Sequence, residues 1–375
     1  MIADPCAPTN QRKLARAECA KVAHCLHHYG VVLARDPRCP SNDNDRFLDL
    51  LEAYYAQPPA AKLQDARPDL HYQVGVLPEG REVPACQSDP ECLRAIAAQP
   101  PEHRARVPRG PDPKWRFHWR IGAGPKPGSE GATRFRRLNA PPVVPAAFAA
   151  EWADVMDGWG GQLVRAARTV AGMAEAAFGL EAGAFRARME GAPHLLAPTG
   201  SDLAAHGAVG TVFAGYHYDL NFLTIHGRAR FPGLAVWLRD GRRVPVQVPE
   251  GCLLLQAGKQ LEWMTGGHVR AGMHEVVSDE RTAAAAARAR REGRSLWRVS
   301  STLFSHLASD ATLAPQGPFA TAEALARYPP TLAGHQVQGE LNDRVGRREA
   351  YYRAAQAGGG AEGGGAEEAA GAAAG

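Results

Sequence analysis

The chain has 375 residues, of which 45% are hydrophobic and 22% charged, so it is long enough to bury a large core as a globular protein. A formal net charge of +4 is small for this length and argues against a nucleic-acid partner, which would need a clustered basic stripe. No apolar run reaches the roughly 18 residues that a membrane-spanning helix requires, so we expect no membrane partner either.

The N-terminal sequence and the cysteines favour an intracellular protein. The segment MIADPCAPTN lacks the basic stretch followed by an apolar stretch that marks a secretory signal. The seven cysteines are odd in number and lack the paired spacing of a metal finger, so we interpret them as reduced thiols and not as a disulfide framework. We therefore predict a cytoplasmic location.

The N-terminal half is predicted to begin with a helix and a short strand. Residues 12–29 repeat apolar side chains at helical spacing, Gly30 ends the helix, and residues 31–34 are typical of a strand. Residues 24–28 include three histidines and a cysteine that could hold zinc, but no second pair of ligands has the spacing of a zinc site. We interpret this cluster as the surface of a helix.

Two further helices and a long loop are expected before the middle of the chain. A helix capped by Asn44 or Asp45 should end at Pro58. Residues 80–113 lack hydrophobic periodicity and predict a long loop. Residues 145–178 predict a longer helix.

The pattern changes near residue 194 to short runs of β-forming residues separated by glycine, proline and aspartate. Many short strands at regular spacing predict a sandwich or a barrel. Residues 282–293, alanine-rich and then arginine-rich, interrupt this series and predict a helical insertion. The expected strands are 211–217, 222–226, 234–238, 244–248, 252–256, 274–277 and 297–304.

We therefore expect four segments in chain order. A mostly helical region over 1–190 is followed by a barrel over 191–310 and a helical closure over 311–356. The tail over 357–375 repeats glycine, alanine and glutamate, cannot bury a core and is predicted to be disordered.

The segment Gly-Tyr-His-Tyr-Asp contains the first candidate metal ligands, His217 and Asp219. Residues two apart in a strand project from the same face, so both side chains can reach one metal ion. A third ligand on a neighbouring strand would complete a 2-His-1-carboxylate triad, which leaves open coordination positions on Fe(II). A His-x-Asp triplet is common by chance, and a solvent-exposed polar pair at a strand end is the alternative.

Further motifs follow this pair in an order that resembles the isopenicillin N synthase-like family of 2-oxoglutarate- and Fe(II)-dependent oxygenases. The opening helix and strand are also similar to the N-terminal region of that family. The matching segments are Leu223-Thr224, Gly233-Leu234-Ala235-Val236, Val248-Pro249-Glu250-Gly251, Gly258 to Gly267, His274 and Arg298-Val299-Ser300.

The resemblance implies a mixed α and β fold whose barrel is a double-stranded β-helix, or jelly roll. It implies that His217, Asp219 and His274 are the catalytic Fe(II) ligands. It implies that Arg298 and Ser300 bind the far carboxylate of the co-substrate 2-oxoglutarate. The implied reaction is oxidation, and by default hydroxylation, of a small organic molecule through a ferryl intermediate. The sequence contains no signal for an oligomeric state.

Some positions depart from the family pattern. Lys259 stands where the family has aspartate, and Glu275 stands where it has arginine. Residues 193–198 lack the tyrosine that helps to hold 2-oxoglutarate in the family. Two alternatives therefore stay open: an Fe(II) oxidase of the same fold that does not use 2-oxoglutarate, and a non-catalytic barrel that binds a ligand.

Two further histidines compete for a place in the site. His268 is the rival of His274 as the distal ligand, but His268 lies in a glycine-rich turn whereas His274 opens a strand. His226 could face the barrel interior, where we expect packing or support of the metal site and not metal ligation.

Three aromatic residues are candidates for the wall of a substrate pocket. Phe213 precedes His217 by four residues on the same predicted strand, so the two side chains should share a face. Tyr72 and Trp119 are the candidates from the N-terminal half, although aromatic residues are more often part of a core.

Overall fold

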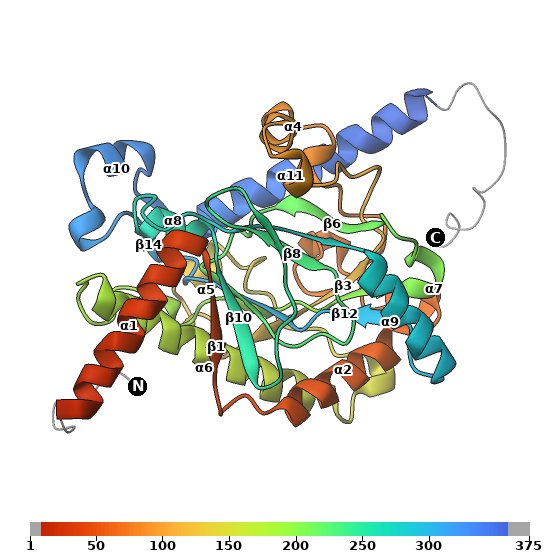
Figure 1. The fold of residues 1–375 in the computed structure, drawn as a ribbon, viewed down its shortest axis with the longest axis horizontal. Helices are drawn as coiled ribbons and strands as arrows, with labels where there is room; N and C mark the ends of the chain where they lie inside the picture. Colours follow the sequence, from red (N-terminus) through yellow and green to blue (C-terminus); the bar gives the residue numbers. More distant parts are fainter. Residues whose placement is uncertain (1–8, 359–375) are drawn as a thin grey trace.

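The computed structural model describes residues 9–358, which form a mixed α and β fold (Figure 1). The predicted tail, 357–375, falls almost wholly outside the described residues, as does Cys6. Among the residues described, no helix combines the length and the apolar character needed to cross a membrane.

The N-terminal region supplies helices and also strands of the main sheet. The first helix ends where the sequence predicts, because Gly30 adopts a left-handed φ of +73° and its N–H donates to the carbonyl of Leu26. The second helix begins at Ser41, ahead of the expected cap. The elements are α1 (Thr9–Tyr29), β1 (Val31–Arg35), α2 (Ser41–Tyr55), α3 (Pro59–Leu63), β2 (Gly75–Leu77), α4 (Pro90–Ala97), β3 (Trp115–Ile121), α5 (Glu130–Thr133) and α6 (Trp152–Ala177).

Most strands of the barrel come from the second half, as predicted. They and the helices between them are β4 (His194–Leu196), β5 (Thr199–Asp202), α7 (Leu203–His206), β6 (Val212–His217), β7 (Leu223–His226), β8 (Leu234–Trp237), β9 (Arg243–Pro245), β10 (Cys252–Ala257), α8 (Lys259–Met264), β11 (Met273–Val277), α9 (Glu280–Arg291), β12 (Trp297–Val299) and β13 (Thr302–Ser305). The closing elements are β14 (Thr312–Leu313), α10 (Ala322–Arg327), β15 (Thr331–Leu332) and α11 (Ala333–Gly358). Short 3-10 helices lie at Pro68–Leu70, Ala85–Gln87, Pro101–His103, Ala146–Phe148, Arg186–Met189 and Gly317–Phe319.

Two antiparallel sheets form the barrel. The larger has nine strands in the order β1-β10-β7-β13-β4-β3-β5-β12, with β2 also paired to β3. The smaller has four strands in the order β6-β11-β8-β9, and β14 pairs with β15 apart from both. Strands β1, β2 and β3 precede residue 190, so the N-terminal region completes the barrel's larger sheet.

The central strand β3 was not predicted. Its sequence, WRFHWRI, is buried at every position except Arg120. A strand that is covered on both faces lacks the alternation of polar and apolar residues by which half-buried strands are recognised.

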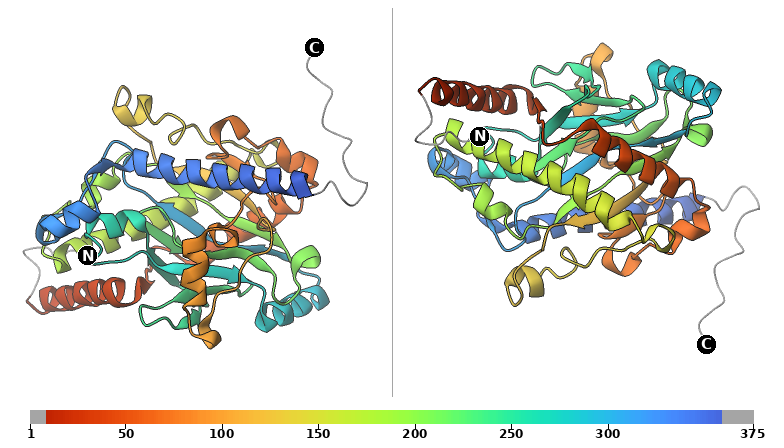
Figure 2. Two further views of the ribbon diagram at one scale, coloured as in Figure 1. Left: turned by 90° about the horizontal axis from the view of Figure 1, so that it is seen from above. Right: turned by 90° about the horizontal axis from the view of Figure 1, so that it is seen from below.

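Helices cover the larger sheet from outside. The main core lies between this sheet and α6, with α1 and α2 packed beside α6. Figure 2 shows α6 and α2 on the side seen from below, and α11 across the side seen from above. The predicted insertion is confirmed as α9, whose side chains Ala285, Ala286 and Ala289 pack against Phe213 and Phe231.

The segment predicted as one loop, 80–113, contains α4 and a disulfide. The helix begins because Asp89 accepts a hydrogen bond from the N–H of Cys92 and Pro90 occupies the first helical position. Cys86 and Cys92 form the disulfide, so the prediction of reduced thiols is wrong for this pair. The two cysteines are 6 residues apart, one in the 3-10 helix Ala85–Gln87 and one in α4, and a single close pair of this kind matches no disulfide framework. The free cysteines of the described range are Cys19, Cys25, Cys39 and Cys252.

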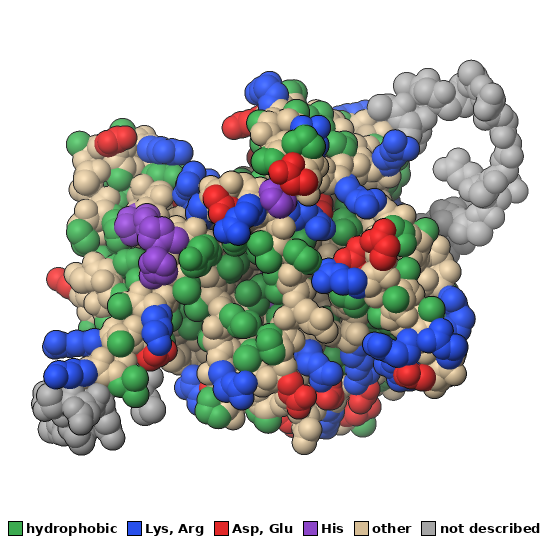
Figure 3. All heavy atoms as spheres, viewed as in Figure 1, with side chains coloured by type: hydrophobic (Ala, Val, Ile, Leu, Met, Phe, Trp, Pro, Cys, Tyr) green, Lys and Arg blue, Asp and Glu red, His purple; other side chains and the backbone are tan. Residues whose placement is uncertain are grey.

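The histidines near the end of α1 gather at the surface, where Figure 3 shows a histidine cluster. The ring of His27 stacks on that of His268 with centroids 4.0 Å apart. In the described part of the chain, neither His27 nor His268 belongs to a group of three ligand atoms close enough to share a metal ion. The cluster therefore stays a helix surface in our interpretation.

Candidate active site

The three predicted metal ligands meet at one end of the barrel. His217 ends β6, Asp219 follows it in the turn, and His274 on β11 is the register partner of His217. The Nε2 atom of His217 lies 3.7 Å from Asp219 Oδ1, and that of His274 lies 3.6 Å from Asp219 Oδ2. One ligand atom from each residue lies within 4.8 Å of the other two. This is the donor set that a mononuclear Fe(II) site requires.

Hydrogen bonds behind the two imidazoles turn both rings toward a common centre. His217 Nδ1 lies 2.6 Å from the Gly215 carbonyl oxygen, to which it can donate, so that Nδ1 carries the hydrogen and Nε2 the lone pair. His274 Nδ1 lies 2.7 Å from Gln256 Nε2, which also donates to the Gly272 carbonyl. Both rings are therefore oriented through Nδ1, with Nε2 turned toward the common centre. For His274 to offer the Nε2 lone pair to a metal, its hydrogen must be on Nδ1, where the Gln256 amide oxygen can accept it once the amide is flipped.

The protonation of the triad also fits a dication. Burial would raise the pKa of Asp219, but the neighbouring His274 and His217 and a 2.6 Å hydrogen bond from Thr224 Oγ1 hold it at about 2. Burial, with repulsion from His217, lowers the pKa of His274 to about 4. Near pH 7 Asp219 is therefore a carboxylate and His274 a neutral imidazole, which are the forms that bind metal.

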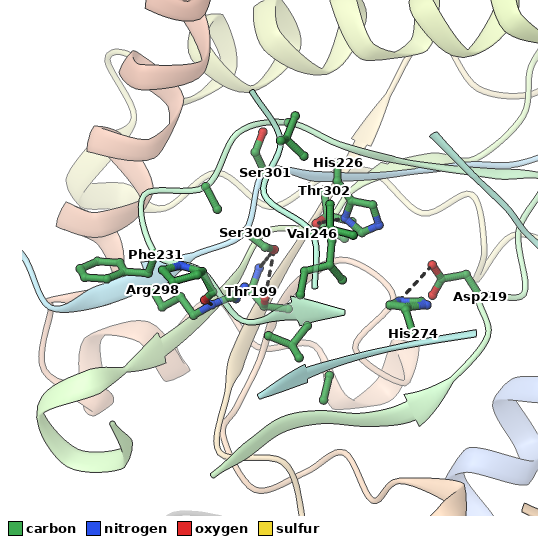
Figure 4. Close-up of a pocket in the computed structure, with 18 of the residues that line it drawn as sticks. Thr199, Asp219, His226, Phe231, Val246, His274, Arg298, Ser300, Ser301 and Thr302 are labelled. Atoms are coloured by element: carbon green, nitrogen blue, oxygen red, sulfur yellow. Dashed lines mark hydrogen bonds and ion pairs between the residues drawn. The ribbon is translucent and has the colours of Figure 1, made fainter. Parts of the chain in front are cut away.

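A cavity of about 80 Å³ leads from this triad into the barrel, and we call it the inner chamber. Its far end is lined by Arg298 and Ser300, and Figure 4 shows both groups across the chamber from Asp219 and His274. The predicted metal ligands and the predicted co-substrate residues therefore line one cavity.

Arg298 is a buried cation without a carboxylate at ion-pair distance among the described residues. The side chain is only 4% exposed, and its Nε donates to the Pro232 carbonyl at 2.8 Å. No aspartate or glutamate among the residues described lies within 4.0 Å of it. Asp279, which is ion-paired with Arg281, attracts it only through space, and burial lowers the pKa of Arg298 to about 10. A buried charge without an ion-pair partner destabilises the folded protein, so an anionic ligand bound to this guanidinium would be stabilising.

The backbone beside Arg298 is shaped to admit its side chain. Gly233 has a φ of +129°, and a Cβ on it would lie 3.3 Å from Arg298 Nε and 2.7 Å from the Val277 carbonyl oxygen. Only glycine suits both this conformation and this close approach. The Gly-Leu-x-Val motif thus contributes to the anion site through its first residue.

Ser300 is held in place by Thr199, which sequence reasoning missed. Ser300 Oγ accepts a 2.9 Å hydrogen bond from the N–H of Thr199 and lies 2.9 Å from Thr199 Oγ1. Both side chains line the inner chamber. Thr199 was overlooked because β5, the strand that it begins, was not predicted.

A larger cavity of about 690 Å³ lies on the other side of the triad, and we call it the outer pocket. His217 and Asp219 line both cavities, and so do Arg116 and Phe304. A molecule in the outer pocket can therefore approach the metal centre from the side opposite Arg298.

Tyr72 lines the outer pocket in a strained conformation. His71 and Tyr72 have φ values of +50° and +58°, which cost non-glycine residues on the order of 1 kcal/mol each. The Tyr72 carbonyl lies 2.8 Å from His118 Nδ1, and this contact helps to hold the turn. Tyr72 stays a candidate for substrate contact.

A buried ion cluster forms part of the same wall. Lys114 Nζ lies 2.5 Å from Asp112 and 3.0 Å from Glu82, and Arg116 lies 3.0 Å from Glu82. Burial raises the pKa of Asp112 to about 6. Two acids and two bases balance, so the cluster offers polar contacts to a ligand without a net charge.

Phe213 and Trp119 line neither cavity. Phe213 packs against α9, because the register between β6 and β11 slips beyond His217 and Ala214 lines the inner chamber instead. Trp119 is buried beneath the sheet, where its Nε1 donates to Asp157 at 2.8 Å. We therefore remove both residues from the candidate substrate contacts.

Comparison with known proteins agrees with this geometry. Residues 202–307 match the model of the 2OG-Fe(II) oxygenase superfamily. None of the curated proteins matches the chain in sequence.

Solved structures extend the likeness to most of the chain. A "putative 2OG-Fe(II) oxygenase family protein" from Caulobacter crescentus is 23% identical, with a TM-score of 0.66 over 91% of this chain and 98% of that one. A full-length Neurospora crassa protein in complex with alpha-KG is 16% identical, with a TM-score of 0.67 over 88% and 92%. The rice dioxygenase for auxin oxidation is 18% identical, with a TM-score of 0.58 over 88% and 90%.

These matches confirm the predicted fold class and the predicted cofactor class. The two antiparallel sheets form the double-stranded β-helix of these oxygenases, and the superfamily is the one that uses Fe(II) and 2-oxoglutarate. The narrower assignment to the isopenicillin N synthase-like family stays a prediction. Residues 202–307, which supply most strands of the barrel, are similar to the 2OG-Fe(II) oxygenase superfamily.

Proposed function

We propose that the protein uses 2-oxoglutarate and O2 at a mononuclear Fe(II) centre to oxidise, by default to hydroxylate, a small organic molecule in the outer pocket. The observation that carries this proposal is Arg298. A buried guanidinium without a carboxylate partner in the described chain lines the same chamber as His217, Asp219 and His274. A metal triad alone would suit many reactions. A triad that shares its chamber with a buried guanidinium suits a co-substrate that carries a carboxylate at the end remote from the metal.

In this proposal each end of the inner chamber binds one end of the co-substrate. His217, Asp219 and His274 would hold Fe(II), and Arg298 with Ser300 would hold the far carboxylate of 2-oxoglutarate. When bound, Fe(II) and 2-oxoglutarate together supply the activation of O2 and an oxidant that removes hydrogen from the substrate.

The protein's own residues orient the reactants and exclude water. Thr224 and Gln256 keep the ligands of the triad aligned, so that the open positions face the cavities. The apolar side chains Leu234, Val246 and Phe231 form part of the wall of the inner chamber. A small chamber that admits the co-substrate alone would protect the reaction from water.

A small-molecule substrate is supported by the size and chemistry of the outer pocket. Its volume of about 690 Å³ falls within the range of pockets for small ligands. The similar Neurospora crassa protein was also solved with alpha-KG and thymine, and JOX2 with 2OG, Fe and JA. We propose the same kind of partner here, and no nucleic acid; the cytoplasmic location stays a prediction.

The test is an anaerobic titration of the protein with Fe(II) and 2-oxoglutarate, followed by the weak visible charge-transfer absorption of the chelate. It compares the wild type with His217→Ala and Arg298→Ala. We expect an absorption band in the wild type that disappears in His217→Ala and needs much more 2-oxoglutarate in Arg298→Ala. Metal binding without the band would favour an oxidase that does not use 2-oxoglutarate, and no metal binding would exclude the enzyme.

A further inference from the structure

We propose that His226 also binds the co-substrate. Its imidazole, which lies between the metal triad and Arg298, would form a hydrogen bond with the bound 2-oxoglutarate. This inference rests on the proposed function and deepens it. No pattern in the sequence assigned His226 to the co-substrate.

The position of His226 follows from the pairing of the larger sheet. It is the last residue of β7, and its register partners are Thr302 on β13 and Leu254 on β10. Its ring lines the inner chamber and lies 6.0 Å, centroid to centroid, from that of His274. Figure 4 shows His226 beside Thr302, between Asp219 and His274 on one side and Ser300 and Arg298 on the other.

The hydrogen bonds of His226 are incomplete. Its Nδ1 lies 3.4 Å from Thr302 Oγ1, whereas its Nε2 is covered and has no partner among the described residues. When the Thr302 hydroxyl donates to Nδ1, the ring hydrogen is on Nε2, which then needs an acceptor. A buried donor without an acceptor costs about 1–3 kcal/mol. An oxygen of a bound 2-oxo acid would remove that cost.

Two other roles for His226 fit the structure less well. Metal ligation is disfavoured because the group of ligand atoms within 4.8 Å of one another comprises His217, Asp219 and His274 and does not include His226. Packing alone is disfavoured because leucine would fill the same space without an unsatisfied nitrogen.

The chemistry of the neighbouring groups favours an added donor. Arg298 uses its Nε on the Pro232 carbonyl, and Ser300 Oγ already accepts from the N–H of Thr199. The anion site therefore depends on the terminal nitrogens of one guanidinium and one hydroxyl. A histidine N–H supplies one more directed hydrogen bond within the same chamber.

The experiment compares the wild type with His226→Leu, His226→Gln and Arg298→Ala, with His27→Leu on α1 as the matched control. The dissociation constant of 2-oxoglutarate is measured anaerobically by calorimetry on the Fe(II)-loaded protein. Thermal unfolding of each metal-free protein, without 2-oxoglutarate, is measured in parallel. The glutamine amide can place a hydrogen-bond donor where Nε2 lies, so His226→Gln tests whether a donor at this position restores 2-oxoglutarate binding.

We expect His226→Leu to weaken 2-oxoglutarate binding about 10-fold, the effect of losing one hydrogen bond to a charged group. His226→Gln should recover most of that loss, and His27→Leu should bind like the wild type. The metal-free His226→Leu protein should melt no earlier than the wild type, because the variant removes an unsatisfied buried nitrogen.

Three outcomes would overturn the proposal. Unchanged binding in His226→Leu, with binding lost in Arg298→Ala, would remove His226 and leave the proposed function intact. Earlier melting of metal-free His226→Leu, with the binding loss not rescued by glutamine, would mean that the histidine is structural. Absence of 2-oxoglutarate binding in the wild type would overturn both this inference and the proposed function.

Discussion

His217 and His274 are register partners across β6 and β11, with ring centroids 4.1 Å apart. Immediately beyond them the register slips at Val276 and again at Val277. The pairing thus presents two imidazoles on one face and then changes which side chains of β6 face the inner chamber. Bulges are common next to active sites, where they orient one side chain and change which face of the sheet the following side chains of the strand occupy.

The first prediction concerns Phe213, which this slip turns away from the site. Phe213→Ala should lower the free energy of unfolding by about 3 kcal/mol, because it empties a fully buried position against α9. The dissociation constant of 2-oxoglutarate should not change. Denaturant unfolding and calorimetry measure the two quantities, with exposed Val144→Ala as the control. A large loss of 2-oxoglutarate affinity in a folded Phe213→Ala protein would contradict our placement of this residue.

The second prediction concerns the support of Asp219. Thr224→Val keeps the side-chain volume but removes the 2.6 Å hydrogen bond to Asp219 Oδ2. We expect roughly 10-fold weaker Fe(II) or Mn(II) binding, the usual effect when a metal ligand loses its hydrogen-bond partner. Anaerobic metal titration provides the measurement, and Thr312→Val on β14 is the surface control. Equal metal affinity in Thr224→Val and wild type would mean that the triad is held without this hydroxyl.

The third prediction tests whether charge alone explains Arg298. Arg298→Lys keeps the positive charge but loses the planar pair of donors that binds a carboxylate bidentately. We expect 2-oxoglutarate binding to weaken by at least about 10-fold, whereas Arg294→Lys on the surface should have no effect. The concentration of 2-oxoglutarate at half-maximal chelate absorption measures this change. A lysine variant that binds 2-oxoglutarate as tightly as the wild type would show that the site requires only a cation.

The fourth prediction concerns acid stability of the metal-free protein. Burial lowers the pKa of His194 to about 4 and that of His306 to about 3. Because both folded values lie below the roughly 6.5 of an unfolded histidine, the unfolded chain binds more protons as the pH falls. The stability is complete above about pH 6.5 and decreases toward pH 4. Denaturant unfolding in EDTA at several pH values should show this decrease.

A matched variant isolates the contribution of His194. Its Nδ1 accepts the N–H of His306 at 3.1 Å, and an asparagine oxygen can replace that acceptor without titrating. His194→Asn should therefore reduce the loss of stability between pH 7 and pH 4.5 by about 2 kcal/mol. Exposed His24→Asn should leave the pH dependence as in the wild type. An unchanged curve for His194→Asn would assign the acid sensitivity to other groups.

The sequence was informative wherever local patterns carry the signal. Helix α1 and its end at Gly30, the insertion α9 and most strands of the barrel could be predicted, because hydrophobic periodicity and turn residues act over a few positions. His217 and Asp219 were selected by residue type and spacing, and His274 by the resemblance to the oxygenase family. The structure brings the three together.

The sequence by itself determined which residues have the chemistry for metal and carboxylate binding, since these properties belong to the side chains. Only the tertiary structure decided which of them share a space. The burial of β3 on both faces hid that strand, and the register slip in β6 sent Phe213 toward α9. Arg298 is buried without a carboxylate at ion-pair distance in the described chain, and His226 Nε2 has no hydrogen-bond partner there. Both features depend on strands that are far apart in the sequence. Solvent exclusion and strand register arise only when the whole barrel closes, so no local pattern could reveal them.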